Sequence, residues 1–358
     1  MAQRLAIIVK GYPRLSETFV AQEILSLQNA GFDLVIVSQR QPYDALTHPV
    51  HAAITAPVVY LPEHCHRQPW RVVKAWWRAM DLPGYPAART VLKDHLKKGG
   101  ARARWRRFWQ ACILATEIEA DAYYVHFIHA PATTTWYAAL LTGKAWAMSA
   151  HAKDIYTNDP ADTAAKVAAA QWLTTCTKAN VAVLKEQVAA SDRGKIHLAY
   201  HGYQPAAFPA YNRPPASKDG RDPAHPVVIM SVGRAVPKKG YDLLLKALAD
   251  IPATLSWHLH HIGKGDILED LKKQAHALGV SSRITWHGPA DQKTIRRHYR
   301  EADLFVLPCR ITADGDRDGL PNVLMEAMTQ GVPCISTTIS AIPEIIEHDK
   351  TGLLVPPE

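Results

Sequence analysis

Residues 5–38, LAIIVKGYPRLSETFVAQEILSLQNAGFDLVIVS, contain a pattern that decides the fold of the first part of the chain. Two short apolar runs, residues 5–9 and 34–38, have the length and composition of buried strands. Between them the apolar positions follow the helical period, with Ser16 as a candidate cap and Gly31 as a stop. A strand, a helix and a strand in this order form a right-handed crossover between parallel strands. We therefore predict an α/β domain with a parallel sheet.

The same alternation continues along the chain. Further strands are expected at residues 53–60, 122–126 and 145–149. Six prolines between positions 204 and 226 indicate a linker. After it, strands and helices alternate again, with strands at 227–232, 255–262, 283–286, 304–308 and 332–336 and helices at 240–249, 267–278, 292–302 and 321–330. The length of 358 residues also favours two domains. We predict two Rossmann-like doubly wound domains facing a cleft, residues 1–203 and 227–358, with ligands at the carboxyl ends of the strands.

The composition is that of a soluble globular protein, with 47% hydrophobic and 21% charged residues. No apolar run approaches the ~18 residues that a membrane span requires, and residues 5–9 are too few for a signal peptide. The five cysteines are odd in number and form no CxxC pair, which favours reduced thiols and a cytoplasmic location.

The net charge of +8 is concentrated in residues 67–109. Twelve lysines and arginines stand there against two acidic residues, a local balance of +10, so the rest of the chain carries −2. Five tryptophans (Trp70, Trp76, Trp77, Trp105 and Trp109) lie in the same segment. A basic segment rich in tryptophan is typical of binding to an anionic membrane surface or to nucleic acid. The short helix expected at Trp70–Trp77 would carry rings and charges all around it, which favours peripheral docking. The alternative is a solvated basic surface.

A second informative stretch is DRDGLPNVLMEAMTQG, residues 316–331. Pro321 suits the first turn of a helix, and the free amides around Gly319 and Leu320 would form an anion site at its start. Glu326 stands alone among apolar residues of the predicted helix. A carboxylate there could accept two hydrogen bonds from a vicinal diol such as a ribose, whereas the alternative is a solvated surface glutamate.

The stretch SVGRAVPKKGYDLLLKAL, residues 231–248, places Arg234, Lys238 and Lys239 in the loop after the first strand of the second domain. A forked guanidinium and a point-charge ammonium on a strand-to-helix loop are groups that bind a diphosphate. The alternative for each lysine is a solvated charge.

Together these stretches resemble the C-terminal half of retaining GT-B glycosyltransferases of family 4. The resemblance rests on VGR with KKG, on GKG at residues 263–265, on DGLPNVLME, on GVPCISTTISAIPEI and on TGLLVPPE. In the first half, GYPRLSETFVAQEI, VHFIHAPAT and SAHAKDIY resemble the bacterial exopolysaccharide members of the colanic acid type. The resemblance extends from about residue 4 to the last residue.

The resemblance implies a role for several residues. Arg234 and Lys239 would bind the donor diphosphate, and Glu326 would bind the ribose. Asp318 and the amides of Gly319 and Leu320 would hold the donor sugar and phosphate. His151 would reach the sugar from the first domain, and Gly11 of the GYPRLSETFVAQEI motif would contact substrate.

Three features depart from the family pattern. Asp318 replaces the first glutamate of the E-x7-E pattern, and Ala341 replaces a frequent glycine. The chain ends before the last helices of the family, so a truncated sequence is expected. No metal or other cofactor is expected, because the family works without one. The histidines at 258, 260 and 261 and the group His64, Cys65, His66 also have no distant partner pair at zinc spacing.

We therefore expect a retaining hexosyltransferase that uses a UDP- or GDP-sugar and a lipid-linked or polysaccharide acceptor in exopolysaccharide or lipopolysaccharide biosynthesis. It would act in the cytoplasm, docked on the inner face of the membrane. Two alternatives remain. One is another enzyme of this fold, such as a phosphorylase or a nucleotide-sugar epimerase. The other is a basic nucleic-acid-binding protein. That alternative does not explain the charged residues of the second domain, in the stretches 231–248 and 316–331.

Overall fold

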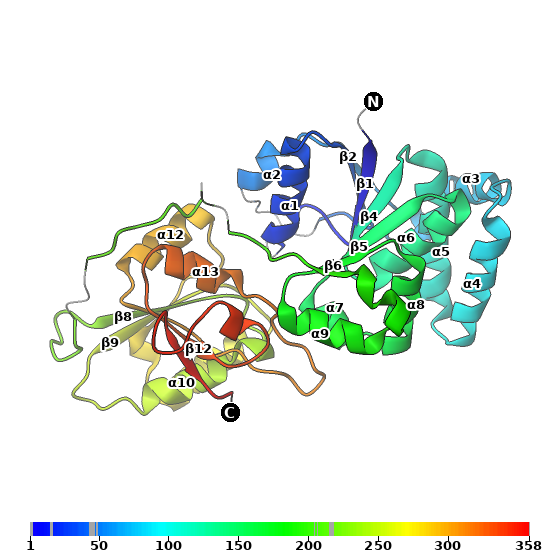
Figure 1. Cartoon of the computed structure of the whole chain (residues 1–358). Helices are drawn as coiled ribbons and strands as arrows, with labels where there is room; N and C mark the ends of the chain where they lie inside the picture. The colour runs from blue at the N-terminus through cyan, green and yellow to red at the C-terminus, as the bar shows by residue number, and fades with distance from the viewer. Residues whose placement is uncertain are drawn as a thin grey trace. The chain divides into compact units, whose positions relative to one another are not determined.

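The computed structural model describes residues 3–14, 17–42, 47, 49–203, 205, 207–214 and 218–357. The chain divides into two compact units, Met1–Cys176 with Asn180–Tyr200 and Thr177–Ala179 with His201–Glu358. Each unit contains one parallel sheet with helices on both faces (Figure 1), so the prediction of two doubly wound α/β domains is confirmed. The candidate cap Ser16 lies outside the described residues, and helix α1 begins at Thr18.

The first unit has a seven-stranded sheet in the order β3-β2-β1-β4-β5-β6-β7. The strands are β1 (Arg4–Val9), β2 (Asp33–Ser38), β3 (Val58–Tyr60), β4 (Ala122–His126), β5 (Ala145–Ala150), β6 (Leu173–Thr175) and β7 (Ile196–Leu198). The strand order reverses between β1 and β4, which are neighbours in the sheet. Loops at such a switch point diverge and leave room for a ligand at the carboxyl ends of the strands.

Alternate residues of these strands face opposite layers of helices. Ile7 and Ile36 pack in one apolar cluster with Ile24 of helix α1 (Thr18–Asn29). Ile8 and Val37 belong to a second and larger cluster on the other face. Because both faces are covered, the strands read as continuous apolar runs rather than as alternating ones.

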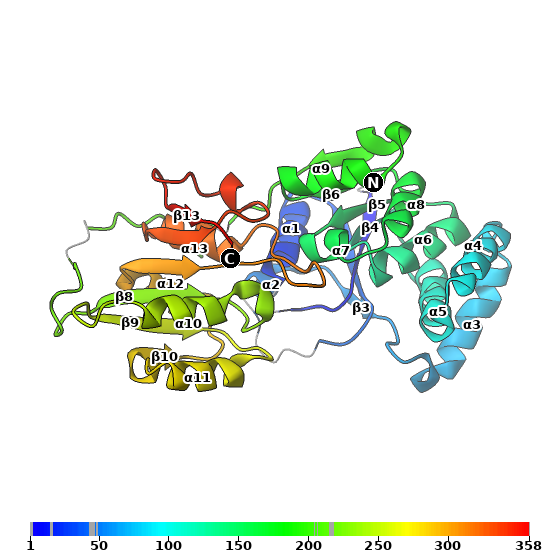
Figure 2. The ribbon, with the colours of Figure 1, turned by 90° about the horizontal axis from the view of Figure 1, so that it is seen from below.

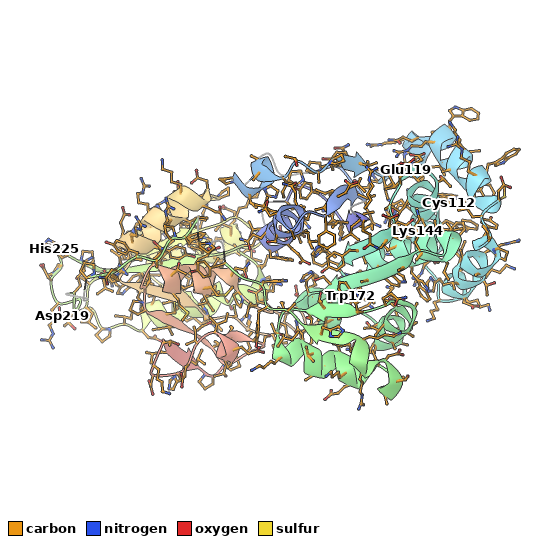
Figure 3. All side chains as sticks on the ribbon, turned by 45° about the horizontal axis from the view of Figure 1, so that its top comes forward. Cys112, Glu119, Lys144, Trp172, Asp219 and His225 are labelled. Carbon is orange, nitrogen blue, oxygen red and sulfur yellow. The ribbon has the colours of Figure 1, made fainter. Side chains whose placement is uncertain are left out.

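The remaining helices of the first unit are α2 (Pro49–Ala53), α3 (Pro69–Met80), α4 (Tyr85–Lys97), α5 (Ala101–Glu117), α6 (Ala130–Thr142), α7 (Ala152–Tyr156), α8 (Pro160–Ala169) and α9 (Lys178–Gln187). Helix α5 packs against α6, and its Cys112 is fully buried in the larger cluster (Figure 3). The predicted strand over residues 53–60 is wrong in its first part. Ala53 ends a helix, and only Val58–Tyr60 pairs with β2.

The second unit has a six-stranded sheet in the order β10-β9-β8-β11-β12-β13. Its strands are β8 (Val227–Val232), β9 (Trp257–Ile262), β10 (Ile284–Trp286), β11 (Leu304–Leu307), β12 (Cys334–Thr337) and β13 (Leu353–Val355). Helices α12 (Gln292–Glu301) and α13 (Asn322–Thr329) lie on one side of this sheet and α10 (Tyr241–Ala249) on the other (Figure 1). Helix α11 (Leu268–Ala277) lies beside α10 (Figure 2).

All five cysteines are free thiols in this structure. Among the described residues, no helix combines the length and apolar character that crossing a bilayer requires.

Candidate functional site

The loop that follows β8 is held close to two other loops by glycines. Gly240 has a φ of 66°, and a Cβ there would lie 1.9 Å from the carbonyl oxygen of Pro308. A Cβ on Gly263 would lie 1.9 Å from the carbonyl oxygen of Gly233. Only glycine permits these backbone approaches. The loops after β8, β9 and β11 therefore meet at the carboxyl edge of the second sheet.

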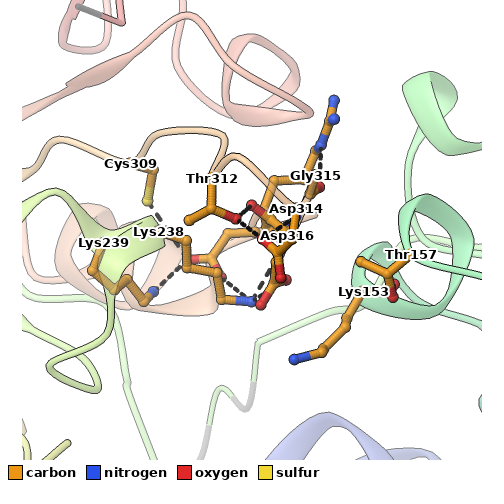
Figure 4. Close-up of polar contacts among 11 residues, drawn as sticks. Lys153, Thr157, Lys238, Lys239, Cys309, Thr312, Asp314, Gly315 and Asp316 are labelled. Atoms are coloured by element: carbon orange, nitrogen blue, oxygen red, sulfur yellow. Dashed lines mark hydrogen bonds and ion pairs between the residues drawn. The ribbon is translucent and has the colours of Figure 1, made fainter. Parts of the chain in front are cut away.

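Lys238 and Lys239 end the short 3-10 helix η3 (Pro237–Lys239) and point toward the acidic loop after β11 (Figure 4). The Lys239 Nζ lies 2.5 Å from Oδ2 of Asp318. The Lys238 Nζ lies 3.3 Å from the other oxygen of Asp318 and 3.1 Å from Oδ1 of Asp316. The sequence predicted that these lysines bind a ligand; in this structure they form ion pairs with the carboxylates of Asp316 and Asp318.

Burial and charge act in opposite directions on this cluster. Burial alone would raise the pKa of Asp318, but the ammonium groups of Lys239 and Lys238 outweigh it and hold that pKa well below its usual range. Burial lowers the pKa of Lys239, and the nearby Asp318 carboxylate reverses this and raises it. Both groups are therefore ionised at neutral pH. Burial, followed by the charge of Asp318, raises the pKa of the adjacent Cys309 thiol, so this cysteine stays neutral.

Arg234 lies two residues beyond the end of β8 and is exposed. Within the described part of the chain, its side chain forms no ion pair or hydrogen bond. Its backbone carbonyl accepts a hydrogen bond from Val236, which fixes the turn toward η3. Arg234 thus presents an unpaired cation at the strand end where the resemblance places the donor diphosphate.

Helix α13 begins at Asn322 after Pro321, without a side-chain cap. Its first amides and the helix dipole point to the preceding loop, which contains Gly319 and Leu320. Ala341, which stands where the family often has glycine, donates a backbone hydrogen bond to the Gly319 carbonyl. The loop that contains Ala341 therefore reaches the loop before α13. The predicted start of the helix differs from the observed one by a single residue.

Glu326 lies one turn after Asn322 and its carboxyl group is enclosed. The hydroxyl of the buried Tyr299 lies 3.4 Å from Oε2 of Glu326 and donates a hydrogen bond to the Val323 carbonyl. Burial raises the pKa of Glu326 to about 7, although the Tyr299 hydrogen bond lowers it in part. The Oδ1 of Asn322 is also buried, and no partner for it is found within the described ranges. Two enclosed acceptors on one helix face fit a ligand that brings hydroxyl donors.

His151 follows β5 in the first unit and starts helix α7. Its amide donates to Asp154, and its ring is stacked on that of His126, whose Nδ1 lies 3.4 Å from the His151 Nε2. Glu23 in turn lies 3.9 Å from the other nitrogen of His126. His151 is buried but stands at the carboxyl edge of the first sheet, where the sequence placed it.

Gly11 lies just after β1, beside the switch point of the first sheet, and is buried. A Cβ there would lie 3.2 Å from Nε of Arg40 and 3.5 Å from Cδ of Arg14. Burial, followed by the charges of Arg40 and Arg14, lowers the pKa of Lys10. Glu17 pairs with Arg14. Three cations therefore meet around Gly11, a grouping that the sequence analysis missed because β1 and β2 bring together residues far apart in the chain.

The structure thus brings Arg234, Lys239, Asp318 and the start of α13 together in the second unit. It places His151 and Gly11 in the first unit. Sequence reasoning missed Tyr299, the hydrogen-bond partner of Glu326, because a tyrosine on an amphipathic helix reads as an ordinary core residue.

Residues 212–358 match the family model described as glycosyl transferases group 1. A GDP-mannose-dependent phosphatidylinositol monomannoside mannosyltransferase of Mycobacterium tuberculosis is 38% identical over 129 residues, 36% of this chain and 34%, about a third, of that protein. The colanic acid biosynthesis glycosyltransferase WcaL of Escherichia coli K12 is 27% identical over 355 residues, 96% of this chain and 85% of WcaL.

The solved structure of HepE of Anabaena with UDP-glucose superimposes with a TM-score of 0.65 at 14% identity, over 99% of this chain and 86% of HepE. At that identity the match shows the fold alone. The family resemblance read from the motifs is confirmed: the second half of this chain is a group 1 glycosyl transferase domain, on a chain with the GT-B fold.

Proposed function

We propose that this protein is a retaining glycosyltransferase that moves a sugar from a nucleotide diphosphate sugar to a lipid-linked or polysaccharide acceptor in exopolysaccharide biosynthesis. One observation carries the proposal. The carboxyl edge of the second sheet brings together Arg234, Lys239 and the start of α13, which would bind a diphosphate. Glu326 and Asn322 lie on the same helix, and their enclosed oxygens would bind a ribose. Relatives named for GDP-mannose and HepE with bound UDP-glucose support a nucleotide sugar donor.

The hard step in such a transfer is the departure of the nucleoside diphosphate, on which negative charge grows as the glycosidic bond breaks. Fixed positive groups that meet this charge lower the barrier. In this chain Arg234, Lys239 and the amides near Gly319 would supply them. The departing phosphate oxygen would take the proton of the acceptor hydroxyl, as expected for transfer that retains configuration at the sugar.

Lys239 and Asp318 form an ion pair in this structure. A bound diphosphate would compete with Asp318 for the Lys239 ammonium. Asp318 would then be free to accept hydrogen bonds from the hydroxyls of the donor sugar. Lys238, which contacts both Asp316 and Asp318, would keep the acidic loop in place during this exchange.

The cations around Gly11 support an anionic acceptor. Lys10, Arg14 and Arg40 converge at the carboxyl edge of the first sheet, where partial burial and then the charges of Arg40 and Arg14 lower the pKa of Lys10. A phosphate or diphosphate group carries more negative charge than a carboxylate and would bind these guanidinium and ammonium groups. A glycan linked to a lipid through phosphate carries such a group. We therefore assign the acceptor side of the reaction to the first unit.

Helix α3 supports docking on a membrane. Trp70, Val73, Trp77 and Met80 follow the helical period along one exposed stripe, with Trp70 84% and Trp77 69% exposed. The expectation of rings all around this helix is wrong, because Trp76 turns inward and donates a hydrogen bond to the Tyr85 hydroxyl. An apolar stripe flanked by cations fits insertion into the interface of an anionic leaflet. We propose that the enzyme works as a peripheral protein on the cytoplasmic face of the membrane.

The central test is binding and turnover of nucleotide sugars. Calorimetric titration with UDP- and GDP-sugars should identify one base that binds, and a membrane extract with lipid-linked glycan should yield a glycosylated product. Arg234→Ala should lower turnover more than donor affinity, because its partner charge grows as the bond breaks. A rise in the donor KM at unchanged kcat would instead show that Arg234 binds the donor equally in the ground state and in the transition state. Binding of neither base would overturn the proposal, and phosphorolysis or epimerisation without acceptor would replace it.

A further inference from the structure

Three histidines that are distant in the sequence meet on one side of the second sheet. His260 lies on β9, His287 follows β10, and His298 lies on α12. One nitrogen from each ring lies within 4.8 Å of the others. Nδ1 of His260 lies 2.8 Å from Nε2 of His287. The ring centroids are 4.7 to 5.7 Å apart.

The sheet register explains this meeting. His260 and His261 point to opposite faces of β9, and the ring of His261 packs against Tyr241 on the other side. Strand β10 pairs in parallel with β9, and Trp286 lies beside His261. His287 directly follows Trp286 and therefore lies close to His260 and His261. Helix α12 then covers the face to which His260 points and brings His298. Spacing along the sequence gave no sign of this group, because its members come from three elements.

We propose that His260, His287 and His298 form a binding site for a transition-metal ion of the zinc type. Imidazole nitrogen is a preferred ligand of Zn²⁺, and three histidines with a water molecule make a common four-coordinate set. Nδ1 of His260 and Nε2 of His287 share one hydrogen bond, so one of the two rings carries its proton on the nitrogen that faces the other ring. For the ion to bind both nitrogens, that ring would move its proton to its other nitrogen by exchange with solvent, and both rings would remain neutral ligands.

The geometry needs only a small adjustment. Zinc–nitrogen bonds of about 2.0–2.1 Å in a tetrahedral site place two ligand nitrogens roughly 3.3 Å apart. The observed 2.8 Å pair must therefore open by about half an ångström. His287 is exposed and the other two rings are half-buried, so small rotations of the side chains suffice. The Glu301 carboxylate lies 3.7 Å from Nδ1 of His298 and adds negative charge beside the site.

The histidine cluster is separate from the proposed donor site. None of the three histidines belongs to the groups assigned to the donor, which come from the loop after β8, the loop after β11 and helix α13. The metal site is therefore a second site on the same unit, tying β9, β10 and α12 together.

The test is zinc binding by the full chain, prepared without a polyhistidine tag and stripped of metal, in competition with a chromophoric chelator. We expect one site of micromolar affinity or tighter, weakened at least tenfold in His287→Gln and in His298→Gln. The matched control is His225→Gln, an exposed histidine in the loop before β8 (Figure 3), which should bind zinc like the unaltered chain. Zinc should raise the Tm of the control but not of the two cluster variants.

Cobalt gives a second readout that does not depend on affinity. Co²⁺ in the histidine site should show visible absorption of a four-coordinate nitrogen–oxygen set without a thiolate charge-transfer band. The proposal is overturned if the unaltered chain binds no zinc in the micromolar range or if both cluster variants bind it as tightly as the control. A thiolate band would assign the ion to the cysteines instead. Circular dichroism of the variants separates lost ligands from lost folding.

Discussion

The burial of Glu326 costs the folded state stability when the carboxyl group is ionised, whereas its proposed function, binding a ribose, requires the ionised form. It is a carboxyl group among apolar neighbours, and burial moves its pKa from 4.5 to about 7. The hydroxyl of Tyr299, 3.4 Å from Oε2, is a long hydrogen bond and only partly offsets this cost. Two hydroxyls of a ribose would donate to the ionised carboxylate and favour its charge. The proposed ribose contact would therefore account for the isolated carboxylate in the sequence.

This environment predicts the pH dependence of stability. The folded state binds the Glu326 proton more tightly than the unfolded state, so the free energy of unfolding should fall as pH rises from about 4.5 to about 7. The size of this contribution is roughly 2 kcal/mol, because the side chain keeps some contact with solvent. Glu326→Gln should remove the slope and unfold at a higher temperature than the unaltered chain at pH 8.

Donor affinity should change in the opposite direction. In the unaltered chain it should rise with pH through about 7, as Glu326 ionises. In Glu326→Gln it should be flat with pH and weaker by roughly 1.5 to 3 kcal/mol. Calorimetric titration at pH 6 and 8 measures both effects. If the two proteins bind the donor equally well at pH 8, Glu326 does not bind the ribose.

At the scale of elements, helix α3 makes a prediction of its own. The exposed stripe of Trp70 and Trp77 and the exposed cations Lys74 and Arg78 should bind vesicles that contain anionic lipid. Each cation near such a surface contributes about 1 kcal/mol, so Lys74→Ser with Arg78→Ser should weaken binding by about 2 kcal/mol, roughly thirtyfold, at low salt. Trp70→Ser with Trp77→Ser should weaken binding at all salt concentrations, because it removes the apolar contact.

The control for this experiment is Trp172→Ser, another exposed tryptophan of the first unit, 39% exposed and outside α3. It should leave vesicle binding unchanged. Sedimentation with vesicles at two salt concentrations measures each effect. Equal binding to neutral vesicles would argue against docking on an anionic leaflet, and tighter binding to duplex DNA would revive the nucleic-acid alternative.

The elements themselves were largely predictable from the sequence. Strands β4 and β8 begin and end where the apolar runs do, because both are buried on their two faces. Strands β6, β7 and β13 were missed, since three residues are too few to show a period. The charges of the site were found, but their pairing was not, because the contact of Lys239 with Asp318 joins two loops about 80 residues apart in the sequence. The histidine cluster was missed for the same reason.

At the scale of the whole molecule, the proposed binding groups are divided between the two units. Arg234, Lys239 and Glu326 belong to the second unit, and the cations around Gly11 belong to the first. Each group is built on the carboxyl edge of its own sheet, so its geometry is fixed by local packing. Donor and acceptor recognition should therefore be separable by mutation.

Arg40→Gln and Glu326→Gln test this division as a matched pair, since each replaces one charged group by an amide. Arg40→Gln removes a cation from the Gly11 site, and losing one charge-assisted contact of about 1.5 to 3 kcal/mol should raise the acceptor KM roughly tenfold or more. Its donor KM should stay within about twofold of the unaltered enzyme, because Arg40 belongs to the proposed acceptor site of the first unit. Glu326→Gln should show the reverse. If Arg40→Gln instead weakens calorimetric binding of the nucleotide sugar in the absence of acceptor, the cations of the first unit belong to the donor phosphate, and the acceptor must be recognised elsewhere.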